Sequence, residues 1–146
     1  NADVGDEDVQ KAIEIAQAKG FIEEKENGIL SEISQGGTNV SGGQRQRLSI
    51  ARALAKRPKV YIFDDSFSAL DFKTDAALRK ALSEETKDKT VLIVAQRIST
   101  IMNAEKIIVL DEGKIVGMGT HKELLKNCSV YKQIALSQLS EEELAI

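Results

Sequence analysis

The sequence predicts an α/β fold in which a helical front portion is followed by a parallel sheet. Apolar residues recur at helical spacing in the front portion, and short apolar runs then alternate with helical segments. The run Val60–Phe63 is continuously apolar, which is typical of a strand buried on both faces of a parallel sheet, and Thr90–Val94 predicts a second buried strand. We therefore expect a helical portion over residues 1–55, an α/β core over 56–139 and an acidic tail over 140–146.

The first helices are predicted from their ends. Asp6 is expected to cap a helix that Gly20 ends, because the apolar residues between them repeat at helical spacing. Residues 21–40 predict a second short helix and then the glycine-rich loop Gln35–Thr38.

The segment Ser41-Gly42-Gly43-Gln44 is expected to open a third helix, because Ser41 and Gln44 form an S-x-x-Q capping box. The free N–H groups and the positive dipole end of such a helix tip favour an anion, and two glycines would let the anion approach the backbone closely. A capped helix after a flexible turn explains the same residues without any ligand. Arg45 and Arg47 are interpreted as solvated charges on the helix surface.

Two carboxylates follow the first predicted strand. Asp64 and Asp65 would lie at the carboxyl edge of a parallel sheet, where α/β folds bind ligands. One carboxylate there can hold Mg²⁺ and a second can position an attacking water. The alternative is a pair of loop acids that cap the next element. Ser68–Asp71 and Gln96 carry little weight alone, since a helix cap explains Asp71 and an exposed glutamine after a strand is common.

The remaining elements are short and are predicted from caps, turns and apolar runs. They are, in order, a helix capped by Asp71, a helix over 98–104, strands over 107–110 and 114–116, and helices from Thr120 to about Ser137. Asp111-Glu112-Gly113 predicts a three-residue hairpin turn between these strands, and Thr120 with Glu123 predicts a second capping box.

The composition excludes several classes of protein. With 146 residues the chain fits one domain, and its net charge of −3 gives no electrostatic attraction to nucleic acid or anionic lipid. Its apolar runs are far shorter than the about 20 residues that cross a bilayer. Cys128 is the only cysteine, which excludes an internal disulfide and fits a reducing compartment, and His121 is the only histidine, which excludes a histidine-rich metal site.

Several motifs in order make the chain resemble the nucleotide-binding domain of an ATP-binding cassette (ABC) transporter of the exporter type. Val40–Arg47 is similar to the signature loop of that family, Tyr61–Asp64 to its Walker B strand, and Ser68–Asp71 to its D-loop. Ala95–Thr100 occupies the position of the switch loop, and Glu32–Gly37 resembles the loop by which exporter domains touch their membrane helices. The resemblance implies a partial P-loop (RecA-like) ATPase sheet with an N-terminal helical signature subdomain.

In that family two domains close head to tail around two ATP molecules, and each ATP lies between one domain's Walker motifs and the other domain's signature loop. The resemblance implies that Ser41–Gln44 bind the γ-phosphate of ATP held by the partner domain. It implies that Asp64 serves the Mg²⁺ of this chain's own nucleotide and that Asp71 lies at the dimer seam. It also implies transmembrane domains as partners, export as the activity and a location at the cytoplasmic face of the cell membrane.

Two catalytic positions depart from the family pattern. Asp65 stands where the family normally has Glu, and its shorter side chain draws the carboxylate back by about 1 Å, which can cost ~10²-fold in rate. Gln96 stands where the switch His is normal, and Gln can bond a phosphate oxygen but cannot carry a proton. Both positions serve this chain's own nucleotide, whereas the signature loop is intact. We therefore hypothesise a heterodimeric exporter in which this subunit has a degenerate site and completes an active site on a different subunit.

The sequence contains no G-x-x-x-x-G-K-[ST] motif, the loop that cradles the phosphates of a nucleotide. We expect that this fragment alone neither binds ATP tightly nor hydrolyses it. The missing central strand would leave an open sheet edge, which invites the fragment to associate with a second copy.

Two other classes stay open at this point. A soluble ABC ATPase without transmembrane partners, of the kind that acts in DNA repair or translation, would use the same chemistry. The exporter-like segment Glu32–Gly37 and the acidic charge balance favour the exporter. The other class is an interaction module without nucleotide chemistry, and the intact Ser41–Gln44 segment argues against it.

Overall fold

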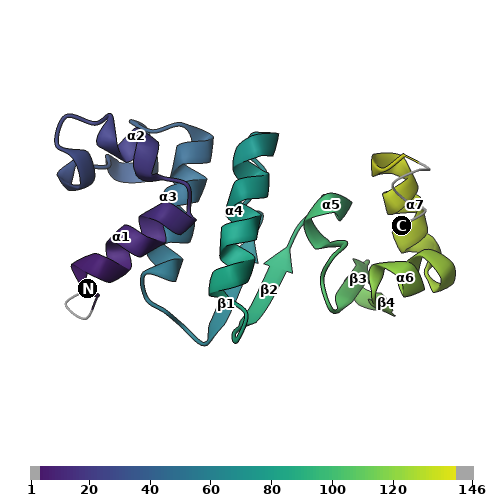
Figure 1. Ribbon diagram of the computed structural model, residues 1–146. Coiled ribbons are helices and arrows are strands. Elements are labelled where there is room, and N and C mark those ends of the chain that lie inside the picture. The colour runs from purple at the N-terminus through teal and green to yellow at the C-terminus, as the bar shows by residue number, and fades with distance from the viewer. Residues whose placement is uncertain (1–3, 141–146) are drawn as a thin grey trace. The chain divides into compact units, whose positions relative to one another are not determined.

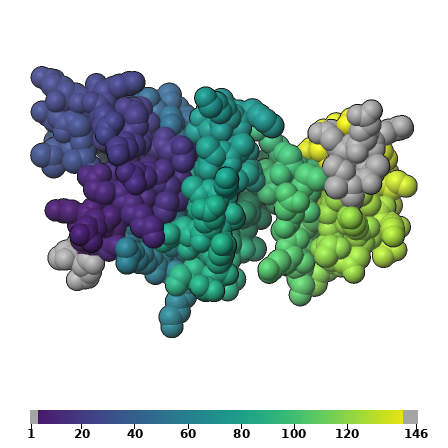
Figure 2. Space-filling view, viewed as in Figure 1, coloured from purple at the N-terminus to yellow at the C-terminus, as the bar shows by residue number. Residues whose placement is uncertain are grey.

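The computed structural model describes residues 4–140, which form two compact units that divide between Val94 and Ala95. Figure 1 shows the first unit in purple to teal and the second in green to yellow, and Figure 2 shows their surfaces in the same colours. Each unit contains both helices and strands, so the predicted α/β class is confirmed. No helix within residues 4–140 combines the length and the apolar content that crossing a bilayer requires. The predicted acidic tail lies outside the described residues beyond Ser140, and the predicted division at residue 55 remains a prediction.

The first unit begins with helix α1 (Asp6–Ile15), helix α2 (Lys19–Glu23) and two 3₁₀ turns, η1 (Gly28–Leu30) and η2 (Gln35–Gly37). Asp6 is not the cap that the sequence predicts, because Gly5 takes the N-cap position. Asp6 instead joins two other acids in the first turn, where they face the positive end of the helix dipole. The prediction that Gly20 ends α1 is also wrong, since Gly20 lies inside α2 and the chain turns at Gln17, which has a φ of 56°.

Helices α3 (Gly42–Leu54) and α4 (Phe72–Glu85) begin at the caps that the sequence predicts. At α3, the Ser41 side chain accepts a hydrogen bond from the Gln44 N–H, and the Gln44 side chain accepts one from the Ser41 N–H. This reciprocal pair confirms the predicted capping box. At α4, the carboxylate of Asp71 accepts a hydrogen bond from the Thr74 N–H at 2.9 Å.

Strands β1 (Val60–Asp64) and β2 (Thr90–Val94) pair in parallel, with Asp64 opposite Val94. The prediction that these strands are buried on both faces is wrong for the described chain. Tyr61 and Phe63 are 3% and 2% exposed, whereas the alternate residues are about half exposed or more: Val60, Ile62, Leu92 and Val94. Because side chains alternate across a strand, the helices of the unit cover one face of this strand pair and leave the other apolar face exposed.

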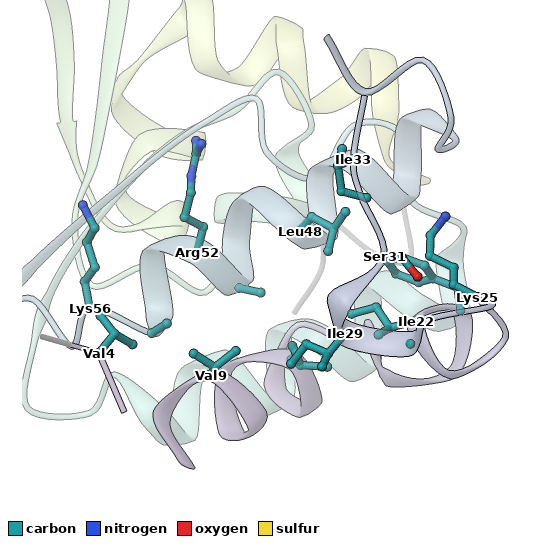
Figure 3. Close-up of a pocket in the computed structure, with 15 residues that line it drawn as sticks. Val4, Val9, Ile22, Lys25, Ile29, Ser31, Ile33, Leu48, Arg52 and Lys56 are labelled. Atoms are coloured by element: carbon teal, nitrogen blue, oxygen red, sulfur yellow. The ribbon is translucent and has the colours of Figure 1, made fainter. Parts of the chain in front are cut away.

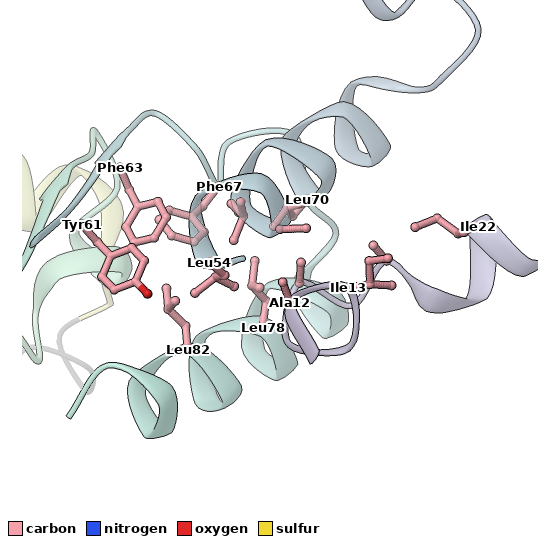
Figure 4. Close-up of a cluster of buried hydrophobic side chains, with 14 of the residues drawn as sticks. Ala12, Ile13, Ile22, Leu54, Tyr61, Phe63, Phe67, Leu70, Leu78 and Leu82 are labelled. Atoms are coloured by element: carbon pink, nitrogen blue, oxygen red, sulfur yellow. The ribbon is translucent and has the colours of Figure 1, made fainter. Parts of the chain in front are cut away.

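The core of the first unit joins helices α1 to α4 to the covered face of the strand pair, as Figure 4 shows. Leu78 of α4 is fully buried, and Leu82 of α4 and Leu54 of α3 lie beside the Tyr61 and Phe63 rings. These two rings stack with their centroids 5.9 Å apart. Burying each such side chain stabilises the fold by about 1.5–3 kcal/mol. The cluster therefore fixes where β1 ends relative to α3 and α4.

The second unit contains helix α5 (Ile98–Ile101), a hairpin of β3 (Ile107–Asp111) and β4 (Lys114–Gly119), helix α6 (His121–Asn127) and helix α7 (Ser129–Gln138). The hairpin turn has two residues rather than the predicted three, because Asp111 pairs with Lys114 inside the ladder. Glu112 and Gly113 have φ values of 46° and 74°, and a type I′ turn requires positive φ at both positions.

The helices α6 and α7 meet at Cys128, which is buried. The predicted capping box between Thr120 and Glu123 is confirmed at the start of α6. His121 is 7% exposed, and its Nδ1 shares a 2.7 Å hydrogen bond with the hydroxyl of Tyr131 on α7. Burial lowers the pKa of His121 and raises the pKa of Tyr131, so both groups stay uncharged at neutral pH.

Candidate functional site

The N-terminus of α3 presents Ser41–Gln44 at the surface. Ser41 is exposed, and the first turn of α3 holds no acidic residue that would oppose the positive end of the helix dipole. Within residues 4–140 the backbone N–H groups of Gly42 and Gly43 have no hydrogen-bond partner, whereas the capping box occupies those of Ser41 and Gln44. The tip of α3 therefore offers two backbone donors to an anion.

The two glycines of this tip are not equivalent. A Cβ at Gly43 would lie 2.9 Å from the carbonyl oxygen of Ala69, which is closer than real Cβ atoms come to backbone. A Cβ at Gly42 would lie 3.6 Å from the Ala69 Cβ, which is an ordinary van der Waals distance. Close packing against Ala69 therefore requires a glycine at position 43, whether or not an anion approaches the backbone there. The sequence alone does not reveal this requirement.

Asp65 lies in the turn directly after β1, and its φ of 45° is in the left-handed region that residues other than glycine rarely adopt. Such a conformation costs on the order of 1 kcal/mol or more, and it persists only where surrounding contacts hold it. The Asp65 N–H donates to the Val94 carbonyl at 3.1 Å, and the carboxylate Oδ2 accepts from the Ser68 hydroxyl at 3.2 Å. The Asp65 side chain is therefore oriented by its own loop.

Gln46 of α3 makes contacts that the sequence does not predict. Its Nε2 donates to the Asp65 carbonyl at 2.9 Å and to the Ser68 Oγ at 3.0 Å. Its Oε1 accepts from the Ala69 N–H at 2.9 Å. The side-chain amide thus uses both of its polar atoms on the loop after β1. The motif match over Val40–Arg47 includes Gln46, but the local sequence does not indicate its partners, so only the fold reveals these contacts.

Asp64 is the last residue of β1, and its exposed carboxylate has no hydrogen-bond or ionic partner within the described residues. Mg²⁺ is usually bound by one or two protein carboxylates together with phosphate oxygens and water. An exposed, unpaired carboxylate at the carboxyl end of a strand fits that chemistry. Within residues 4–140 there is no group of three or more His, Cys, Asp or Glu side chains that could hold a metal ion.

Asp71 lies at the surface as the cap of α4. Hydrogen bonds from Thr74, first from its side chain and then from its backbone N–H, lower the pKa of Asp71 and keep the carboxylate ionised. The next residue, Phe72, is 91% exposed. This end of α4 therefore presents an ionised acid and an aromatic ring side by side.

Gln96 belongs to the second unit, where it is exposed and precedes α5. Its backbone carbonyl accepts a hydrogen bond from the Gln138 Nε2 at 2.9 Å, and the Gln138 Oε1 accepts one from the Ile98 N–H at 2.8 Å. Gln138, from the end of α7, thus holds the segment that presents Gln96. It is a second residue whose contacts no sequence pattern indicates.

The prediction that Arg45 and Arg47 are solvated is wrong for Arg47. Its guanidinium is half-buried, donates to the Gln17 carbonyl at 2.6 Å and lies 4.8 Å from the centroid of the Phe21 ring. Arg45 is exposed, as predicted, but it also donates to the Gly36 carbonyl at 3.1 Å. Arg47 therefore contacts the turn between α1 and α2, and Arg45 contacts the 3₁₀ turn η2 that precedes α3.

A largely apolar cavity of about 530 Å³ lies in the first unit, beside α1, α3 and the segment after α2 (Figure 3). Val9, Ile29 and Leu48 are among the side chains that line it. None of the predicted site residues lines this cavity, so it is separate from the tip of α3 and from the acids after β1.

The sequence matches the ABC transporter family over residues 5–68. It is 47% identical over 135 residues to an uncharacterized ABC transporter ATP-binding protein of Mycobacterium tuberculosis. It is 44% identical over 135 residues to the ATP-dependent lipid A-core flippase of Vibrio vulnificus. Each match covers 92% of this chain and 23% of the relative, so the chain spans less than a quarter of the length of these curated relatives.

Among solved structures, a bacterial Atm1-family ABC exporter with ATP bound is similar to 97% of this chain, with a TM-score of 0.89 and 30% sequence identity. The similar region is 25% of that exporter chain. Together these comparisons confirm the resemblance that the motifs indicate and the P-loop α/β fold class.

Proposed function

Because this chain belongs to the ABC transporter family, within the ATP-binding domain of an exporter, we propose that it lends the tip of α3 to an ATP held by a second nucleotide-binding domain. The tip itself is the observation that carries this proposal. Its cap Ser41 is exposed, its half-buried Gly42 and Gly43 have two backbone donors without partners among the described residues, and no acid in its first turn repels a phosphate. A triphosphate brought by a partner is the anion that the family supplies at this position.

The chain's own nucleotide site is proposed to be degenerate. Asp64 would hold the Mg²⁺ of the nucleotide, which the ion binds through phosphate oxygens and water. Asp65 and Gln96 stand where the family has Glu and His, so the group that orients water and the group that carries a proton are both altered. We expect this site to hydrolyse ATP slowly, while the intact signature loop serves an active site on a different subunit.

The partners follow from the same proposal. They are a second nucleotide-binding domain, with Asp71 and the exposed Phe72 at the seam, and the transmembrane domains of an exporter at the cytoplasmic face of the cell membrane. The soluble alternative is not favoured, because the relative from Vibrio vulnificus is a flippase and the similar solved structure is an exporter. The chain alone, which has no G-x-x-x-x-G-K-[ST] sequence, is proposed not to hydrolyse ATP and to associate through its open sheet edge.

Replacing Gly42 by aspartate tests the role of the tip without damaging the fold. Gly42 has room for a side chain, and an acid in the first turn of a helix is stabilising by about 0.3–1 kcal/mol. A carboxylate about 4 Å from a phosphate costs about 4 kcal/mol at an effective dielectric constant near 20. In the assembled transporter, Gly42→Asp should therefore lower ATP hydrolysis at least about 10²-fold.

Gly42→Ala is the matched control, because it fills the same space without a charge. It should lose much less activity than Gly42→Asp, and hydrogen exchange should show an intact α3 in both variants. Equal ATP hydrolysis by the two variants would contradict the proposal that the tip faces a triphosphate.

A further inference from the structure

The side chain of Gln46, which belongs to the signature segment Val40–Arg47 at the start of α3, joins that segment to the loop after β1. Gln46 lies three residues after Gly43 on α3, so the two share one face of the helix. Both meet the loop after β1, since Gln46 bonds to Asp65, Ser68 and Ala69 and Gly43 packs against the Ala69 carbonyl. We infer that Gln46 is a positioning residue that locks the turn of Asp65 and the start of the D-loop onto the signature helix.

The turn of Asp65 needs hydrogen bonds that hold it in place, because its left-handed φ is costly for a residue with a side chain. We call the three hydrogen bonds of the Gln46 amide the Gln46 lock. On the strand side, the Asp65 N–H is fixed by the Val94 carbonyl. On the other side, the Asp65 carbonyl accepts from the Gln46 Nε2 at 2.9 Å and, less closely, from the Ser68 Oγ at 3.2 Å. Gln46 therefore provides the shorter of the two bonds that hold the carbonyl, and this bond sets the direction from which the Asp65 carboxylate emerges.

The lock also links two nucleotide sites, a consequence that rests on the proposed function. The tip of α3 serves the ATP of the partner, and Asp65 serves the nucleotide of this chain. A helix is stiff over the three residues from Gly43 to Gln46, so a displacement of the tip is passed to the turn of Asp65 through the side-chain amide. Binding at one site then moves the acid at the other.

Hydrogen exchange of the chain tests the lock directly. Gln46→Met keeps the length of the side chain but removes all three hydrogen bonds, so the Ala69 amide should exchange about tenfold faster. Gln46→Glu keeps an acceptor for the Ala69 N–H but loses the donor to Asp65, so the Ala69 amide should stay within about twofold of the wild-type rate. Gln10→Met, an exposed position on α1, is the control and should change nothing. An unchanged Ala69 amide in Gln46→Met would overturn the inference.

Steady-state ATP hydrolysis at this chain's own site, measured in an assembled transporter whose partner site is disabled, tests positioning. Both Gln46→Met and Gln46→Glu should lower kcat about tenfold with KM for Mg-ATP within about twofold, because both lose the bond to the Asp65 carbonyl. A loss confined to Gln46→Met would show that Gln46 acts only on folding, since Gln46→Glu keeps the Ala69 bond, and would overturn the positioning role. If the wild-type transporter hydrolyses no ATP, the proposed function fails, whereas exchange at Ala69 still decides whether the lock exists.

Discussion

Replacing Gly43 by alanine separates the structural role of this glycine from any role in binding an anion. The added Cβ would lie 2.9 Å from the Ala69 carbonyl oxygen and 3.7 Å from the Leu70 Cδ2. The first of these neighbours is backbone, which cannot rotate away, and the Gln46 amide holds the same loop in place from the next turn of α3. The clash can therefore be relieved only if the loop after β1 moves away from α3.

The magnitude follows from comparison with Gly42→Ala. Both glycines lie in the first turn of α3, so each substitution gains a similar helix propensity, at most about 1 kcal/mol. At Gly42 the new Cβ makes an ordinary contact at 3.6 Å, and the net effect should be neutral or stabilising. At Gly43 the overpacking costs about 1–3 kcal/mol. The free energy of opening α3 should therefore differ between the two variants by about 1–3 kcal/mol, with Gly43→Ala the less stable.

Native-state hydrogen exchange at the buried end of α3 is the suitable assay, because it reports on the first unit without reference to the second. The amides of Ile50 and Ala51, whose side chains are 1% and 6% exposed, should exchange about 5-fold to 150-fold faster in Gly43→Ala than in Gly42→Ala. Equal protection in the two variants would refute the reasoning, because it would mean that the loop yields to a Cβ at no cost. Lost ATP hydrolysis with unchanged protection would leave anion binding as the reason for this glycine.

Two further predictions concern the effect of His121 ionisation on stability and the effect of side-chain length at position 65 on turnover. Burial lowers the pKa of His121, so the unfolded chain takes up a proton first as the pH falls through the ordinary value of 6.5. The stability of the second unit should be complete above that pH and decrease below it in urea unfolding, and a pH profile in His121→Phe as steep as the wild type's would disprove this cause. Asp65→Glu, in an assembled transporter whose partner site is disabled, should raise turnover by up to ~10²-fold because the carboxylate gains about 1 Å of reach. Asp88→Glu, an exposed acid in a loop, is its control, and flat turnover in Asp65→Glu would show that this side chain does not limit the site.

The caps of α3, α4 and α6 could be predicted because each depends on residues three positions apart. Ser41 with Gln44 and Thr120 with Glu123 complete their hydrogen bonds within one turn, so the local sequence contains both partners. Gln46 could not be predicted in the same way, since it meets Ala69 across 23 residues of sequence. Such partners become neighbours only when the chain has folded.

The strands illustrate a different limit of sequence reasoning. A continuous apolar run is typical of a strand covered on both faces, but the sequence of a strand cannot state what covers it. Here Tyr61 is buried by helices of the first unit while Ile62 is 66% exposed. Gln17 follows α1 at a positive φ, where its Nε2 donates to the Glu14 carbonyl at 3.3 Å and its own carbonyl accepts from the Arg47 guanidinium of α3. Helix α1 thus ends without a glycine, and Gly20, which the sequence predicts at this end, lies inside α2.

The tip of α3 is too small to hold a triphosphate by itself, and this is a physical reason for its proposed use with a partner. Gly42 and Gly43 can donate two charge-assisted hydrogen bonds worth about 1.5–3 kcal/mol each, and the helix dipole adds about 0.3–1 kcal/mol. The sum, roughly 3–7 kcal/mol, reaches only the lower part of the about 4–15 kcal/mol that association costs a free ligand. When a second domain already holds the nucleotide, the contacts of the whole domain interface offset the free-energy cost of association. The hydrogen bonds from Gly42 and Gly43 then add almost their full free energy to the binding of the loaded partner. The tip would then discriminate between an empty partner and a loaded one, which neither domain can do alone.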